Sequence, residues 1–239
     1  MSEVFRFKKF EIHQDLCSMK VNTDGILLGA WSDLDDKRDA LDIGTGTGLI
    51  AMMLAQRSED LRVTGIEIDQ NSFHQASENA KQSVFSSRMY IIHDSVQQYA
   101  QTATIKYDLI VSNPPFFSGG TFSANENKAN VRHTIKLSHA DLLISVQKLI
   151  ALNGHFDLIL PYMEGLRFIE LAAKYDFYPT HVTEVRSKVD KPVERLLIRL
   201  AYKVQNPLTQ NQLVIHQSNE ANDYSVDFIN LTKAFYLFM

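Results

Sequence analysis

Residues 40–48 of the chain read Ala-Leu-Asp-Ile-Gly-Thr-Gly-Thr-Gly, and this stretch decides the fold. Its first four residues form a short apolar run that is typical of a buried strand. The glycines that follow allow positive φ and let the backbone approach a ligand closely. Residues 49–56 then favour a helix, whose first unpaired N–H groups face polar atoms held at the turn. The order of strand, glycine turn and helix predicts the first unit of an α/β fold.

The same alternation continues outward from this stretch. Apolar runs separated by helical segments predict a parallel sheet covered on both faces. The last two strands, near 179–186 and 194–203, are joined around Lys191-Pro192 with no room for a helix, so we expect them to be antiparallel. We therefore predict an α/β fold with a doubly wound, seven-stranded, mostly parallel sheet and an antiparallel edge strand. The other expected strands are 40–43, 61–68, 89–92, 107–112 and 154–160, with helices near 70–82, 138–151 and 164–175.

The composition excludes several classes of protein. The chain has 239 residues and a net charge of −4, so any binding of nucleic acid needs a local basic face. Cys17 is the only cysteine, which excludes an internal disulfide and a multi-thiolate metal site, and the eight histidines show no ligand spacing. We see no signal peptide and no apolar run of roughly 20 residues. We therefore expect a cytoplasmic protein with no membrane segment and no metal.

The glycine turn has a spacing of its own. Gly44, Gly46 and Gly48 follow Asp42, and the third glycine comes four places after the first, whereas the dinucleotide fingerprint places it five places after. The pattern resembles the first motif of class I S-adenosylmethionine-dependent methyltransferases. Glu67 closes the second strand, where an acid can accept hydrogen bonds from ribose hydroxyls. The same resemblance implies that Asp94, after the third strand, contacts the adenine of the methyl donor. A plain tight turn and solvated loop acids are the alternatives.

Residues 113–116 follow the fourth strand and read Asn113-Pro114-Pro115-Phe116. They resemble the motif of methyltransferases that act on planar amino groups, including adenine N6, cytosine N4 and the glutamine amide. The Asn113 side-chain oxygen and the Pro114 carbonyl can accept both N–H bonds of such a group and favour a pyramidal nitrogen. Phe116 offers a face for stacking on the substrate ring. The alternative is that Asn-Pro-Pro only ends the strand.

Two further stretches of sequence narrow the choice of methyltransferase family. Residues 20–31 read Lys-Val-Asn-Thr-Asp-Gly-Ile-Leu-Leu-Gly-Ala-Trp, and residues 234–239 read Ala-Phe-Tyr-Leu-Phe-Met. With the two motifs above, these blocks closely resemble the bacterial tRNA1(Val) adenine-37 N6-methyltransferases. The resemblance implies an enzyme that methylates N6 of adenine 37, next to the anticodon, with S-adenosylmethionine as methyl donor and tRNA as substrate. It implies neither a metal nor an obligate protein partner. Phe116 stands where this motif often has Tyr.

We expect one methyltransferase domain over 1–239. Residues 1–39 form an N-terminal extension that contributes to the donor and substrate site, residues 40–203 form the core sheet, and residues 204–239 form a C-terminal extension packed on it. The tail adds a short strand at 212–215 and a helix that ends in the last six residues. The short N-terminal part disfavours a protein-glutamine methyltransferase. Another RNA or DNA amino-group methyltransferase, or a noncatalytic RNA-binding protein with a vestigial donor pocket, remains possible on the residues alone.

Basic residues mark candidate RNA contacts. The long segment 117–137 and the basic hairpin 186–203 are candidates for substrate recognition, although a solvated edge hairpin explains the hairpin charges equally well. Thr23 and Asp24 are candidates for lining the donor pocket, and the alternative is that they cap the helix that begins near Gly25. The candidate RNA-binding residues are Lys20, Lys128, Arg132, Arg186 and Lys188.

Overall fold

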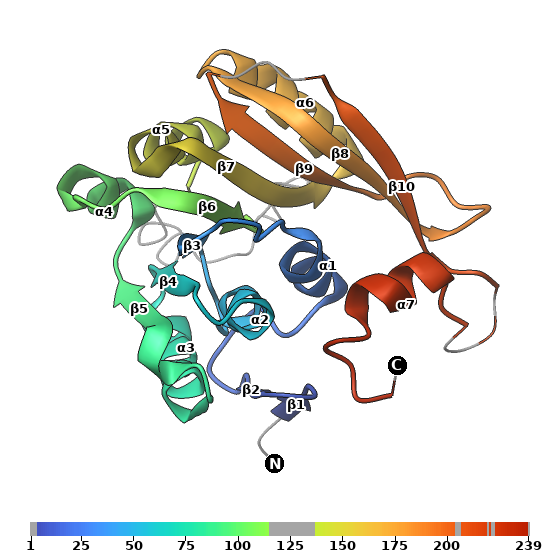
Figure 1. Ribbon diagram of the computed structural model, residues 1–239, viewed down its shortest axis with the longest axis horizontal. Coiled ribbons are helices and arrows are strands. Elements are labelled where there is room, and N and C mark those ends of the chain that lie inside the picture. The colour runs from blue at the N-terminus through green and yellow to red at the C-terminus, as the bar shows by residue number, and fades with distance from the viewer. Residues whose placement is uncertain (1–3, 115–136, 204–206, 219, 221–222, 239) are drawn as a thin grey trace, which may run out of the picture.

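A computed structural model of the chain describes all residues except 1–3, 115–136, 204–206, 219, 221–222 and 239. Its centre is an eight-stranded sheet (Figure 1). Across the sheet the strands are β10 (Thr209–His216), β8 (Phe177–Lys188), β9 (Arg195–Tyr202), β7 (Ile150–Pro161), β6 (Tyr107–Ser112), β3 (Asp39–Ile43), β4 (Arg62–Glu67) and β5 (Met89–His93).

The predicted α/β class and the antiparallel pairing at one end of the sheet are confirmed. β9 runs antiparallel to both β7 and β8, as the short connection around Lys191 requires. Two details are corrected. The sheet has eight strands, because residues 209–216 form a full strand that pairs in parallel with β8. For the same reason the antiparallel strand β9 is not itself the edge strand, since β8 and β10 lie outside it.

Helices cover both faces of the sheet, so the doubly wound arrangement is also confirmed. Alternate residues of β6 show why: Leu109 and Val111 belong to one apolar cluster, and Ile110 belongs to the other. The first cluster contains residues of α1 (Thr23–Trp31), α2 (Leu49–Arg57), α3 (Gln70–Gln82) and α7 (Val226–Thr232). The second contains residues of α4 (Val96–Thr102), α5 (His139–Leu149) and α6 (Tyr162–Ala173). A short 3-10 turn, Ser86–Arg88, precedes β5.

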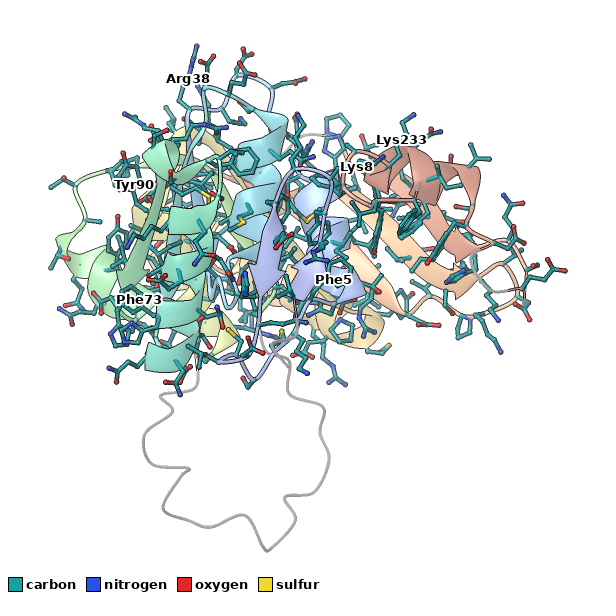
Figure 2. All side chains as sticks on the ribbon, turned by 90° about the horizontal axis from the view of Figure 1, so that it is seen from below. Phe5, Lys8, Arg38, Phe73, Tyr90 and Lys233 are labelled. Atoms are coloured by element: carbon teal, nitrogen blue, oxygen red, sulfur yellow. The ribbon has the colours of Figure 1, made fainter. Side chains whose placement is uncertain are left out.

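The N-terminal and C-terminal segments of the described chain contact each other. A small antiparallel ribbon, β1 (Val4–Arg6) with β2 (Glu11–His13), was not predicted. Between its strands, the Lys8 backbone N–H donates to the Phe235 carbonyl and the Lys8 ammonium donates to the Lys233 carbonyl at 2.6 Å, so the two segments lie side by side (Figure 2). The division into one domain with two extensions stays a prediction. Within the described part of the chain, no helix is long and apolar enough to cross a membrane.

Candidate active site

The glycine turn between β3 and α2 leaves open space. Gly44, Gly46 and Gly48 have φ angles of +71°, +57° and +83°, the left-handed region that glycine adopts without strain. A Cβ atom built on Gly44 or Gly46 would meet no atom within 4 Å. The Gly44 and Thr45 N–H groups donate to the Ile66 carbonyl, which ties the turn to β4. The turn is thus a fixed cradle with room for a ligand.

Asp42 lies directly behind this cradle. Its side chain is completely buried, and one oxygen, Oδ2, accepts hydrogen bonds from Thr45 Oγ1 at 2.6 Å and from the Ala51 N–H at 3.2 Å. The other oxygen, Oδ1, has no hydrogen-bond partner among the described residues. Burial, with a smaller contribution from the Glu67 charge, raises the pKa of Asp42 to about 7. A buried oxygen without a partner beside an open turn fits a ligand that brings its own polar groups.

Glu67 and Asp94 meet at the same edge, as their positions at the end of β4 and directly after β5 predict. The Glu67 carboxylate accepts hydrogen bonds from the Gly46 and Asp69 N–H groups, both at 2.9 Å. The Asp94 N–H donates to the Glu67 carbonyl, and the Asp94 carboxylate accepts from Ser95 N–H at 2.7 Å. Both acids and Gly44 line one small cavity of about 60 Å³. Carboxylates held in place by backbone donors suit the hydroxyl and amino groups of a nucleoside.

Three apolar residues that the sequence reasoning missed complete this cavity. Ile68, Val96 and Leu137 line it, and Ile68 is 44% exposed although it is a large aliphatic residue. Aliphatic side chains beside the carboxylates suit the faces of a flat heterocycle. The available signal was an apolar residue directly after Glu67, where a turn normally has a polar one.

Asn113 is brought to the glycine turn by the pairing of β6 with β3. Ser112, the last residue of β6, pairs with Ile43, the last residue of β3, and its hydroxyl donates to the Ile43 carbonyl at 2.9 Å. Asn113 is therefore level with Gly44, which follows the neighbouring strand about 5 Å away. Asn113 is half-buried and Pro114 is buried. Phe116, Lys128 and Arg132 lie outside the described residues.

The structure settles the capping of α1. Asn22 is the N-cap, and its side-chain oxygen accepts from the Gly25 N–H at 2.9 Å, so neither Thr23 nor Asp24 caps the helix. The Asp24 carboxylate instead accepts from Arg195 Nε at 2.9 Å. A Cβ on Gly25 would lie 3.0 Å from the Leu49 side chain, so the first turn of α1 touches the start of α2. Thr23 and Asp24 line a different cavity, of about 340 Å³, between α1, the sheet and α7.

Of the predicted basic residues that the structure describes, Arg186 and Lys188 lie at the end of β8, at the same edge of the sheet. Arg186 is engaged within its hairpin, where its guanidinium donates to the Lys191 carbonyl at 3.0 Å and lies 3.9 Å from the Glu184 carboxylate. Lys188 ends β8, in register with His216 at the end of β10. Lys20 is exposed and lies two residues before the N-cap of α1.

The N-terminal segment borders the glycine turn on its other side, through residues that the sequence reasoning did not single out. The Asn79 side-chain amide, on α3, donates to the Thr47 carbonyl at 2.9 Å and to the His13 carbonyl at 2.8 Å. The Gln75 side-chain oxygen accepts from the Leu16 N–H at 3.2 Å. Burial raises the pKa of Cys17, and the negative charge of Glu67 raises it further, which places this thiol near the acids of the site.

Comparison with known proteins agrees with this geometry. The family model described as "Methyltransferase small domain" matches residues 23–158. A Proteus mirabilis protein named tRNA1(Val) (adenine(37)-N6)-methyltransferase is 42% identical over 98% of this chain and 94% of its own length. A Haemophilus influenzae protein of the same name is 42% identical over 98% of both chains.

Solved structures share the fold. A predicted O-methyltransferase from Agrobacterium tumefaciens superimposes with a TM-score of 0.72 at 18% identity, over 89% of this chain and 96% of the other. A glycopeptide N-methyltransferase, MtfA, solved in complex with S-adenosylmethionine, gives a TM-score of 0.56 at 10% identity, over 77% of this chain and 100% of the other. On the near full-length similarity to the curated relatives, the chain belongs to the tRNA1(Val) (adenine(37)-N6)-methyltransferase family.

Proposed function

We propose that this protein is an S-adenosylmethionine-dependent enzyme that methylates N6 of adenine 37 in tRNA1(Val). The observation that carries the proposal is the Ser112–Ile43 pairing, which places Asn113 and Pro114 beside the open glycine turn. The relatives that match over nearly the whole chain are named for this reaction. A tRNA substrate and a cytoplasmic location go with the proposal, and it invokes neither a metal nor a protein partner.

The residues of the turn fit the methyl donor. Gly44 and Gly46 offer the space, and the Asp42 oxygen that has no hydrogen-bond partner among the described residues can accept a hydrogen bond from a donor group of the ligand. Glu67 and Asp94 are the acceptors for ribose hydroxyls and for the adenine amino group. When bound, S-adenosylmethionine supplies an electrophilic methyl group on a sulfonium. Thr23 is a further proposed contact near its amino-acid end, as is Asp24.

Asn113 and Pro114 act on the acceptor nitrogen. The lone pair of an adenine amino group is delocalised into the ring, so the nitrogen is a poor nucleophile. Two acceptors, the Asn113 side-chain oxygen and the Pro114 carbonyl, hold its two N–H bonds and favour the pyramidal form. They also stabilise the positive charge that develops on nitrogen during the transfer. No covalent bond between protein and RNA is required.

The remaining proposed contacts bind the substrate. Phe116 is proposed to stack on the target adenine, which is the role of an aromatic face beside an unpaired base. An adenine in a loop reaches such a site at a smaller unstacking cost than a base in a duplex. Lys20, Lys128, Arg132, Arg186 and Lys188 are the proposed phosphate contacts.

The test is methyl transfer to tRNA. The protein is incubated with labelled S-adenosylmethionine and total tRNA that lacks this modification, and the nucleosides are analysed. We expect N6-methyladenosine in tRNA1(Val), and no label in a transcript with guanine at position 37. Label in protein would instead indicate a glutamine methyltransferase. Binding of tRNA without transfer would indicate a noncatalytic protein.

A further inference from the structure

A second cavity lies beside the candidate active site. It holds about 340 Å³ between the start of α1, the ends of β8 and β10, and α7 (Figure 1 shows these elements together). Leu27, Val185 and Phe228 supply buried apolar walls. This volume is in the range of small-ligand sites. Gly44, Glu67 and Asp94 line a different cavity, and of the proposed donor contacts only Thr23 and Asp24 border this one.

Polar groups surround the apolar walls. The Arg195–Asp24 ion pair, with 2.9 Å between Nε and Oδ2, forms one side, and the Ser187 hydroxyl and the Glu194 carboxylate form a hydrogen-bonded pair on another. Thr23 adds a hydroxyl. Donors and acceptors around an apolar slot are what the edge of a nucleobase requires.

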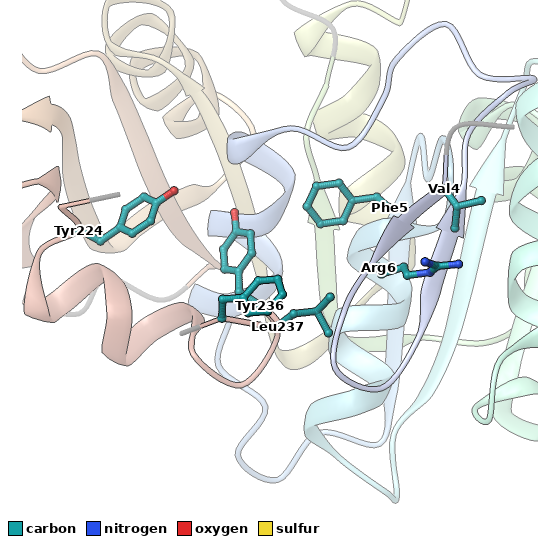
Figure 3. Close-up of a pocket in the computed structure, with 7 residues that line it drawn as sticks. Val4, Phe5, Arg6, Tyr224, Tyr236 and Leu237 are labelled. Carbon is teal, nitrogen blue, oxygen red and sulfur yellow. The ribbon is translucent and has the colours of Figure 1, made fainter. Parts of the chain in front are cut away.

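Aromatic rings form the third side. His216 stacks on Tyr224 with ring centroids 4.8 Å apart and an angle of 28°, and Tyr224 stacks on Phe228 at 5.1 Å and 25°. Tyr224 and Tyr236 also line the neighbouring cavity of about 530 Å³, together with Phe5 and Leu237 (Figure 3). Burial raises the pKa of Tyr236 to about 12, so its hydroxyl stays neutral and able to donate. The aromatic wall thus extends from the sheet edge to the N-terminal ribbon.

The register of the sheet places this cavity at the same edge of the sheet as Asn113. Ser112 pairs with Leu158 on β7, and Pro161, at the end of β7, pairs with Arg195 on β9. Counted across the sheet alone, Arg195 is two strand spacings from Asn113, about 10 Å, and His216 is four, about 19 Å. Along the strands, the register places both residues further toward the carboxyl edge than Asn113. All these residues lie at the edge where the parallel strands end. Because unpaired loop bases can be splayed apart, the base next to the adenine can reach the near side of the cavity, at Arg195.

The charge at the rim suits RNA. Residues 186–195, from the end of β8 to the first residue of β9, carry four basic residues against two acidic ones, although the chain as a whole is acidic. Lys188 ends β8 in register with His216, next to the ring stack. Positive charge outside a slot for a base complements a strand whose phosphates stay in solvent.

We propose that this cavity is a subsite for one unpaired nucleotide adjacent to the methylated adenine. Its base enters between the ring stack and the Arg195–Asp24 pair, and its phosphate lies toward Lys188. The subsite rests on the proposed function for its substrate. It gives the start of α1 and the C-terminal segment a shared role in binding the RNA.

The test measures binding, so it does not depend on methyl transfer. The probe is the unmodified anticodon stem-loop of tRNA1(Val), intact or with an abasic nucleotide on the 5′ or the 3′ side of adenine 37. Ser187→Trp fills the cavity, and Thr102→Trp, at an exposed position at the end of α4, is the matched control. We expect one abasic substitution to weaken binding to the unmodified protein about tenfold. Ser187→Trp weakens binding of the intact probe by a similar factor and is insensitive to that substitution.

Other outcomes separate the two proposals. Equal binding of all three probes, or a Ser187→Trp protein that still senses the abasic nucleotide, overturns the subsite. Unchanged affinity for S-adenosylmethionine and an unchanged melting temperature show that Ser187→Trp is folded. If it is not, Tyr224→Phe replaces it, with an expected loss of about threefold that disappears with the same abasic probe. A chain that binds through this subsite but transfers no methyl group contradicts the proposed function only.

Discussion

Two regions of the sheet edge are built in different ways. The proposed donor half consists of the glycine turn directly after β3, Glu67 at the end of β4 and Asp94 directly after β5. The proposed substrate half joins the start of α1, the ends of β8 and β10, and α7, and its Asp24–Arg195 pair joins residues 171 positions apart. The residues of the donor half thus come from short motifs of the sequence. The substrate half exists only once the chain is folded.

The two regions also differ in how their side chains are held. In the donor half, backbone N–H groups of Gly46, Asp69 and Ser95 fix the carboxylates. In the substrate half, ion pairs and stacked rings hold the side chains, and these pairs are partly exposed. A backbone-held site tolerates little change, whereas partly exposed side-chain pairs contribute modestly. We therefore expect large effects of substitutions in and next to the donor half and graded effects in the substrate half.

The largest effect is expected where the two halves meet. Asn113→Ala removes one of the two proposed acceptors of the amino group, so we expect the single-turnover rate of methyl transfer to fall by about a hundredfold to a thousandfold. Dissociation constants for S-adenosylmethionine and for the anticodon stem-loop should stay within about twofold. A loss of donor affinity as large as the loss of rate would mean that Asn113 belongs to the donor half.

The next effect is on stability and concerns Asp42. Its folded pKa of about 7 lies above the usual value of 3.8, so the unfolded chain releases this proton first as the pH rises. The contribution of the protonated Asp42 to the free energy of unfolding is complete below about pH 4 and is lost as the pH rises through 7. Asp42→Asn cannot ionise and removes this loss. Between pH 5 and pH 8 the free energy of unfolding of the unsubstituted protein should therefore fall by about 3 kcal/mol more than that of the variant. Urea unfolding at both values measures the difference. Parallel curves for the two proteins would contradict the raised pKa.

A smaller effect is expected at the cradle. Gly46→Ala places a side chain at φ +57° and in the open space of the turn, so we expect a loss of about 1 kcal/mol of stability and at least tenfold weaker binding of S-adenosylmethionine. Affinity for the anticodon stem-loop should not change. Asp36→Ala, at an exposed left-handed position with φ +59°, is the control for strain alone and should bind the donor normally.

The same contrast explains what could be predicted from the sequence. Asp42, the glycines and Glu67 were identified because strand, turn and acid are neighbours in the chain, and the pairing of parallel strands brings their ends together. The antiparallel hairpin was predicted from the short connection at Lys191 and is confirmed. These inferences need only local pattern and one rule of sheet geometry.

The remaining features depend on contacts that no local pattern encodes. The parallel pairing of β10 with β8, which moves β9 away from the edge, depends on how the tail crosses the sheet. Residues 212–215 alone predicted only a short strand. Asn22 was not predicted as the cap, because the adjacent Thr23 and Asp24 are also residue types that are common at N-caps. The cavity beside α1 combines residues from five elements, so its composition could not be seen before the fold.

A substitution at Asp24 tests whether this residue belongs to the donor half or to the substrate half. Asp24→Asn keeps the size of the side chain and removes the charge opposite Arg195. If the start of α1 serves the substrate half, affinity for the anticodon stem-loop falls about fivefold and donor affinity is unchanged. Asp39→Asn, which weakens the Arg62–Asp39 pair at the opposite edge of the sheet, is the matched control and should change neither. A selective loss of donor affinity would move Asp24 to the donor half.

The smallest effect is expected at the rim. Lys188→Ala removes one positive charge from the end of β8, and a contact with one phosphate contributes chiefly through counterion release. We expect about threefold weaker binding of the stem-loop, and the slope of log affinity against log salt should fall by about 0.7, the value for one contact with single-stranded nucleic acid. The loss should be the same for intact and abasic probes, because a phosphate contact does not read the base. Lys106→Ala, just before the start of β6 at the opposite edge, should leave the slope unchanged. A Lys188 variant with an unchanged slope would remove the hairpin from the RNA-binding surface and confine the substrate half to the cavity.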